Sequence, residues 1–226
     1  MEDRRRLNRR AGFSLVELII VIAIMAVLSG LITASYIGYM ERAKKARALT
    51  NAKAIFDAAQ IAIIDASTYE NEAFRYALKF EETIDGETVR LGRFSNQSLY
   101  KYLQESGGGG SLSSALSKAA DYRIAESLSG SIKGADGNIE SDLLQDKSPI
   151  GDTNSTKYIS EHPETYGEVV FAMAYNAYGE LVYFQCVYDK YFMTWEQGSG
   201  FTAERVSDST RFNNWPRTRA SGTDGW

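Results

Sequence analysis

The stretch Gly12-Phe13-Ser14-Leu15-Val16-Glu17-Leu18 separates a basic N-terminal tip from a long apolar run. The 23 residues from Leu18 to Met40 carry no formal charge, and at about 1.5 Å per residue they would cross a bilayer core of roughly 30 Å. Glu17 lies at the edge of this run, where a carboxylate is costly to bury without a cationic partner. Because the run is too long for an ordinary secretory signal, the pattern predicts a transmembrane helix that the mature protein retains.

The order and spacing of these residues resemble the class III signal of type IV pilins and pseudopilins. In that signal a short basic leader ends in Gly, and the mature chain opens with Phe, Ser or Thr, Leu, a hydrophobic residue and Glu. The resemblance covers Arg9 to about Tyr39. It implies that a membrane-embedded prepilin peptidase cuts between Gly12 and Phe13 from the cytoplasmic side and methylates the new Phe13 amine.

The resemblance also gives Glu17 a role. Its carboxylate would pair with the Phe13 amine, either within one helix or between neighbouring subunits, and the family favours pairing between subunits. Each charge then offsets the desolvation of the other in an apolar filament core. Snorkelling of Glu17 to the headgroups is the alternative. We interpret Ser14 as a tolerated small residue.

A pilin-like structural subunit, and not an enzyme, is therefore the predicted function. The partners that the resemblance implies are the prepilin peptidase, other pilin subunits, an assembly ATPase with its platform protein complex, and the membrane. Nucleic acid would join them only if the filament serves DNA uptake. Before assembly the chain would be a single-pass cytoplasmic membrane protein with its leader in the cytoplasm. After assembly it would belong to a cell-surface or extracytoplasmic filament, either a pilus or a type II secretion pseudopilus.

The helical pattern continues beyond the apolar run. Apolar residues recur at intervals of three and four through Ala46, Leu49, Ala52, Phe56, Ala59 and Ile63. No Pro occurs before Pro149, so nothing forces a break before about residues 65 to 82. This predicts one continuous helix of roughly 50 to 60 residues.

Downstream segments predict an α+β fold in which the long N-terminal helix packs on a C-terminal antiparallel sheet, as the resemblance also implies. A hairpin is expected over 83–94 and helices over 98–105 and 112–128. Strands over 168–175, 180–188 and 191–196 would form a meander, with Val182, Phe184, Cys186 and Tyr188 on one face. The predicted organisation is a basic leader (1–12), a transmembrane and filament-core helix (13–40), its amphipathic continuation (41–82), a variable connecting region (83–165), and the sheet with a C-terminal tail (166–226).

Composition narrows the function classes. Five Arg precede Gly12, whereas the chain as a whole has a formal net charge of -4, and a basic tip on an acidic body argues against a general nucleic-acid binder. Cys186 is the single cysteine and His162 the single histidine, which excludes an intramolecular disulfide, a zinc site and a visible catalytic triad. Cys186 is expected to be a buried small hydrophobe.

Two weaker signals remain open. Asp136, Asn138, Glu140 and Asp142 alternate after Gly134 and faintly resemble a calcium loop, but Ser141 stands where an EF-hand turn requires Gly. An acidic surface loop is the alternative, so no cofactor is predicted beyond this calcium candidate. The tail over 201–226 interleaves four Arg with Phe212, Trp215 and Trp226. It would serve an uncleaved signal-anchored surface binding or sensor module, the alternative function, whereas a last edge strand with an irregular end is favoured.

Overall fold

The computed structural model describes residues 13–69, 71–84, 86–105, 115–131, 144–150, 152–212 and 218–219. The chain divides into two compact units, Met1–Lys44 and Lys45–Trp226, and the second holds the folded domain. Its elements, with the helix that enters it, are α1 (Leu15–Tyr69), α2 (Asn71–Ala77), β1 (Phe80–Ile84), β2 (Glu87–Ser95), α3 (Asn96–Glu105), α4 (Ala115–Ser131), α5 (Thr156–Glu161), α6 (Pro163–Tyr166), β3 (Val169–Asn176), β4 (Leu181–Tyr188), β5 (Tyr191–Glu196), β6 (Gly200–Arg205) and β7 (Thr218–Arg219).

Helix α1 confirms the prediction of one long helix. It runs for 55 residues without a Pro. Near its end, the hydroxyls of Ser67 and Thr68 both donate to the carbonyl of Ile64, at 2.8 Å each. Such side chains compete locally with the backbone ladder. The helix ends at Tyr69, at the early end of the expected range.

The strands form one antiparallel sheet with the order β6-β5-β4-β3-β2-β1-β7. The predicted hairpin around Gly86 and the predicted meander over β3, β4 and β5 are both confirmed. Strand β2 pairs with β3, with Phe94 opposite Met173, so the hairpin of the connecting region extends the same sheet.

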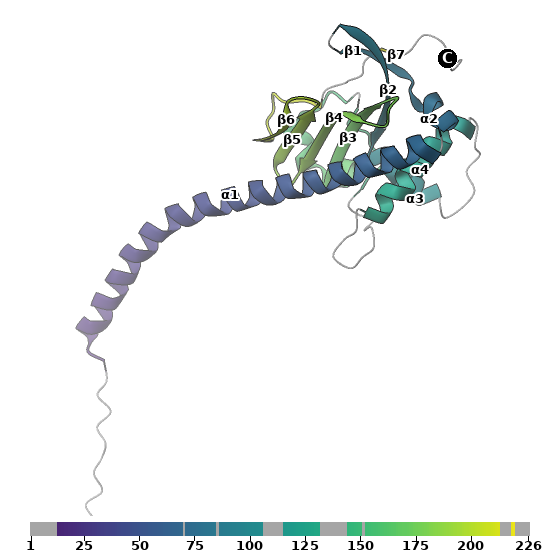
Figure 1. Cartoon of the computed structure of the whole chain (residues 1–226). Coiled ribbons are helices and arrows are strands. Elements are labelled where there is room, and N and C mark those ends of the chain that lie inside the picture. Colours follow the sequence, from purple (N-terminus) through teal and green to yellow (C-terminus); the bar gives the residue numbers. More distant parts are fainter. Residues whose placement is uncertain are drawn as a thin grey trace, which may run out of the picture. The chain divides into compact units, whose positions relative to one another are not determined.

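Small residues let α1 lie close to this sheet. Its inner side carries Ala48, Ala52, Ala59, Ala62 and Ala66, which are fully buried. They share a core with Phe171, Phe184 and Met193 of the strands. Figure 1 shows the C-terminal part of α1 crossing one face of the sheet, with α2, α3 and α4 gathered near its end.

The opposite face of the sheet is covered as well. Val170 and Val187 of the strands pack with Ile159 of α5, Tyr166 of α6 and Phe212. Helices α5 and α6 were not predicted from the sequence, although the signals for their starts were present. The Ser155 hydroxyl caps α5 by accepting from Tyr158 N at 3.0 Å, and Pro163 occupies the first turn of α6. Two covered faces explain why nearly all of β3 is buried.

The predicted shared face of β4 is correct except at Val182. Phe184 and Cys186 lie in the core beneath α1, whereas Val182 packs with Leu91 and Ala174. The cause is a β-bulge: Ala174 pairs with Tyr183 and Tyr175 with Leu181, so Val182 is the extra residue. A bulge reverses the alternation of side chains along the strand.

Two polar contacts fasten α1 to the rest of the domain. The Gln60 amide donates to Gly179 O at 2.8 Å and accepts from Leu181 N at 3.0 Å. The Arg123 guanidinium of α4 lies 2.7 Å from the Asp65 carboxylate. Because both contacts join residues far apart in sequence, they fix the helix against the start of β4 and against α4.

The favoured interpretation of the tail is confirmed where the structure describes it. Strand β6 is the edge strand next to β5, and β7 pairs with β1. Phe212 is 2% exposed, and Arg211 Nε donates to Thr153 O at 2.8 Å. These two residues therefore hold the domain together instead of offering a stacking platform. Trp215 and Trp226 lie outside the described residues.

Candidate processing and assembly segment

The start of α1 is built by a reciprocal pair of hydrogen bonds between Ser14 and Glu17. Ser14 N donates to Glu17 Oε2 at 2.8 Å, and Glu17 N donates to Ser14 Oγ at 3.2 Å. This is a capping box, which satisfies two of the backbone N–H groups that a helix start leaves without partners. The interpretation of Ser14 as a merely tolerated residue is therefore wrong. The S-x-x-E spacing was the signal that could have identified it.

The capping box places the carboxylate of Glu17 next to the proposed cleavage point. Its Oε2 is bonded to the amide of Ser14, the residue that follows Phe13. Phe13 itself is 89% exposed. Cleavage would therefore create a backbone amine at Phe13, one residue before the Ser14 amide that binds the Glu17 carboxylate. The Phe13 side chain is open to contact with other molecules. Gly12 lies outside the described residues.

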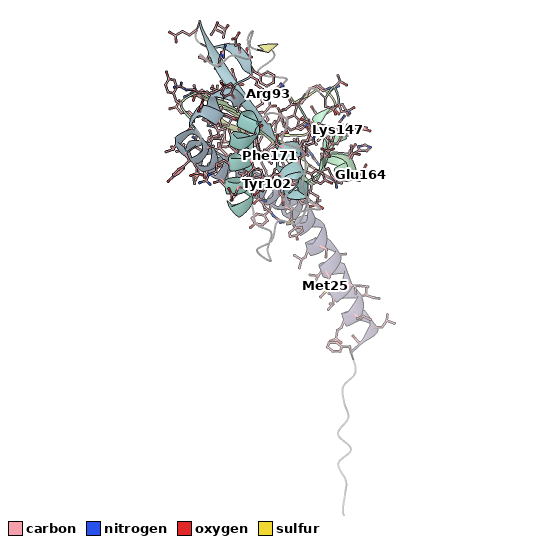
Figure 2. All side chains as sticks on the ribbon, turned by 90° about the vertical axis from the view of Figure 1, so that its right-hand side faces the viewer. Met25, Arg93, Tyr102, Lys147, Glu164 and Phe171 are labelled. Atoms are coloured by element: carbon pink, nitrogen blue, oxygen red, sulfur yellow. The ribbon has the colours of Figure 1, made fainter. Side chains whose placement is uncertain are left out.

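The first turns of α1 present large apolar side chains on all sides of the helix. Those from Leu15 to Leu28 are 45–74% exposed, and Tyr36, Ile37 and Tyr39 are 58–69% exposed. Figure 2 shows the side chains around Met25 standing out from the helix. Covering one such side chain completely is worth about 1.5–3 kcal/mol. A surface of this kind is stable only when lipid, detergent or other protein covers it.

The predicted membrane span was tested on the described residues. Within them, no helix combines the length and the apolar character that a membrane crossing requires. The expected span over 18–40 is thus not found among the described residues.

Of the remaining candidate residues, the structure describes Cys186 and His162 but not the four calcium candidates. Cys186 is buried as expected, and burial raises the pKa of its thiol to about 12, so it is not a reactive nucleophile. His162 Nδ1 donates to Tyr158 O at 2.8 Å, and the His162 ring stacks on the Tyr158 ring. The calcium candidates Asp136, Asn138, Glu140 and Asp142 all lie outside the described residues. Within those residues, no group of three or more His, Cys, Asp or Glu side chains could hold a metal ion.

Comparison with known proteins bears on this same segment. A family model described as the prokaryotic N-terminal methylation motif matches residues 7–33. The chain carries a prepilin-type cleavage and methylation motif. The motif implies processing by a prepilin peptidase, a membrane-anchored leader and extracytoplasmic assembly. Searches of curated proteins and of solved structures found no match.

The fold agrees with the motif. A long N-terminal helix packed on an antiparallel sheet is a pilin-like α+β arrangement. Pilin-like proteins are typically structural and not enzymatic. The resemblance inferred from Gly12, Phe13 and Glu17 is therefore confirmed at the level of the motif and the fold.

Proposed function

We propose that the chain is a type IV pilin-like structural subunit, cleaved after Gly12, methylated at Phe13 and assembled into an extracytoplasmic filament. One observation carries this proposal. The methylation motif over 7–33 covers the start of α1, where the large apolar side chains from Leu15 to Leu28 are about half exposed or more and have no packing partner among the described residues. Helix packing between subunits would cover them.

Before assembly, the same side chains would be covered by the cytoplasmic membrane, with the leader on the cytoplasmic side. The single helix would serve first as an anchor and then as the filament core. Extraction from the bilayer requires work that this chain cannot supply. An assembly ATPase and a platform protein are the proposed source of that work.

Glu17 and Phe13 would set the register between subunits. In the uncleaved chain the Glu17 carboxylate uses Oε2 for the capping box. Its other oxygen remains open to the Phe13 amine of a neighbouring subunit. A charge-assisted hydrogen bond of this kind is stronger than a neutral one, and it strengthens further in an apolar surrounding. A misregistered subunit would bury both charges without partners, which is costly.

The test is the intact mass and N-terminal sequence of the membrane-extracted protein, from cells with and without prepilin peptidase. We expect a chain that begins at methylated Phe13 only when the peptidase is present. Gly12→Val should block cleavage, because a branched side chain would obstruct the protease cleft. Gly30→Ala is the matched control, since a Cβ at Gly30 meets nothing within 4 Å.

An unprocessed chain beginning at Met1 in both strains would overturn the proposal. It would leave Glu17 without an amine partner. The uncleaved signal-anchored binding or sensor module would then be the better account.

A further inference from the structure

The folded unit Lys45–Trp226 carries a protruding turn at one end of strand β4. The turn over 176–180, called here the Tyr178 turn, presents a Tyr side chain that is 85% exposed. Asn176 makes the turn rigid, because its Oδ1 accepts from Tyr178 N at 2.9 Å and from Glu180 N at 3.0 Å. Gln60 of α1 fastens the same turn through Gly179 O. The aromatic side chain is therefore exposed on a fixed support, and little backbone entropy would be lost on docking it.

A cavity of about 390 Å³ opens at the other end of the same strand. This cavity, called here the Arg47 pocket, is lined by Arg47 of α1, Pro163, Glu168, and Tyr188, Asp189 and Lys190 at the β4–β5 turn. Its walls combine an apolar part with two cations and two carboxylates. Among the described residues, neither Arg47 nor Lys190 forms an ion pair. Arg47 and Lys190 thus present positive charge that no ion pair within the described residues engages, close to the carboxylates of Glu168 and Asp189.

The backbone at the rim of the pocket is strained. Asp189 and Lys190 have positive φ angles of 51° and 106°, in a two-residue hairpin turn where Asn-Gly is the favoured pair. A bulky Lys at a positive φ costs folding free energy. A sequence selected for stability alone would place Gly at this position. Strain of this kind is typical of residues that serve a function.

The turn and the pocket are chemically complementary. The Glu180 carboxylate, exposed beside Tyr178, is opposite in charge to Arg47 and Lys190. In a contact between two copies, the Tyr178 hydroxyl would donate to Glu168 or Asp189, and its ring would pack on Pro163 and Tyr188. The two features cannot meet within one molecule, because the eight residues of β4 separate them by roughly 25 Å.

We propose that the Tyr178 turn of one copy docks into the Arg47 pocket of the next copy. This contact joins different surfaces of identical chains, and a contact of this type generates open filaments when the rotation does not close. The inference rests on the proposed function and deepens it. The N-terminal helices supply the cohesion of the filament, and the turn and pocket fix the spacing of the folded domains.

The test uses the full chain, expressed with its peptidase, and Cys residues at the two proposed partners. Filaments of the Tyr178→Cys/Lys190→Cys variant should give a reducible ladder of covalent oligomers under mild oxidation. Native Cys186 is buried and should not contribute. The Tyr178→Cys/Glu126→Cys variant, with an exposed partner on α4, is the matched control and should give no ladder.

A charge exchange gives a second, independent result. Glu180→Lys or Lys190→Glu alone should lower the assembled fraction about tenfold, because each places like charges together, and the double variant should restore assembly. Normal Phe13 processing and normal filaments without a ladder or a charge effect would overturn this inference but leave the proposed function intact. Dimers alone from Tyr178→Cys would indicate a two-fold contact and also overturn it. Failure of Phe13 processing would instead contradict the proposed function.

Discussion

The two parts of α1 show how side-chain size decides what an apolar helix packs against. In the first part, Leu, Ile, Val and Met side chains between Leu15 and Leu28 are about half exposed or more. In the second, Ala48, Ala52, Ala59, Ala62 and Ala66 are completely buried. Both parts are apolar, and both belong to one uninterrupted helix. Among the described residues, only the second part meets its packing partner within the same chain.

The difference follows from geometry. An Ala surface lets a helix backbone approach closely enough for aromatic strand residues to fill the remaining space. Phe56 of α1 makes a larger contact beside these alanines, with its ring centroid 5.7 Å from that of Phe184 and 4.6 Å from that of Trp195. A surface of large side chains on every side of a helix cannot be covered by one sheet face. It requires partners all round, which lipid or a helical filament can supply.

The largest expected effect comes from a substitution in the first part of α1 that leaves the second part unaltered. Glu17→Ala should leave cleavage and methylation intact but lower the yield of filaments about a hundredfold or more, because the Phe13 amine would be buried in the filament without its partner. Asp57→Ala, which removes an exposed carboxylate of α1, is the control and should assemble normally. The measurement is the ratio of sheared filament protein to processed protein. Normal filament yield from Glu17→Ala would contradict the proposed pairing.

The second effect comes from a substitution that destabilises the folded domain and leaves the first part of α1 unaltered. Phe171 is fully buried beneath α1, so Phe171→Ala should lower the free energy of unfolding by about 3–5 kcal/mol. Phe13→Ala removes the same ring from a position that is 89% exposed, and it should leave that free energy within about 0.5 kcal/mol. Denaturant unfolding of the detergent-solubilised chain, followed by Trp fluorescence, measures both. Equal losses would show that the two parts are not energetically separate.

Sequence reasoning succeeded where the signal was local. The motif around Gly12, Phe13 and Glu17 and the β1–β2 and β3–β4 hairpins depend on residues close together in the chain. The pairing of β2 with β3 joins residues such as Leu91 and Asn176, and no local pattern marks it. The bulge at Val182 depends on the register against β3, which the alternation within β4 does not reveal.

The processing and assembly segment at the start of α1 was also only partly predictable from the sequence. Glu17 was identified through its chemistry, but the sequence alone did not show which contact it makes before cleavage. Ser14 was overlooked because its partner had already been assigned to another role. The predicted strands over 168–175 and 180–188 already place a turn at Tyr178, and the structure confirms it. The contact of this turn with Gln60 and the Arg47 pocket could not be predicted, because α1 brings Arg47 to one end of β4 and Gln60 to the other only once the domain has folded.

A smaller effect concerns the pH dependence of the folded domain. Burial raises the pKa of Asp121 from 3.8 to about 6, although the positive charge of Lys79 opposes the shift. The folded state therefore binds this proton more tightly than the unfolded state. The carboxylate costs no stability below about pH 4, and the cost grows as the pH rises to about 6 and is complete above it.

Asp121→Asn should remove this cost. At pH 7.5 the variant should be more stable than the parent chain by about 1–2 kcal/mol, allowing for partial solvent screening. Between pH 4 and pH 6 the difference should shrink as the pH falls. Thermal unfolding across this range measures it, and Asp208→Asn, which changes an exposed carboxylate, is the control. A difference that does not vary with pH would contradict the assignment to Asp121.

The smallest expected effect tests the capping box and separates its role from that of the pairing charge. Ser14→Ala removes the hydroxyl that accepts from Glu17 N, which should destabilise the first turn of α1 by about 1 kcal/mol. The Glu17 carboxylate remains, so subunits can still pair, and the filament yield should fall only about two- to fivefold. Amide hydrogen exchange in the first turn should be faster by a similar factor. Thr50→Ala, which removes a hydroxyl bonded to Ala46 O within the helix, is the control and should leave the first turn unchanged. If Ser14→Ala abolished assembly as completely as Glu17→Ala, the prediction would be contradicted. The capping box would then be as necessary for assembly as the charge of Glu17, because it holds the carboxylate in position.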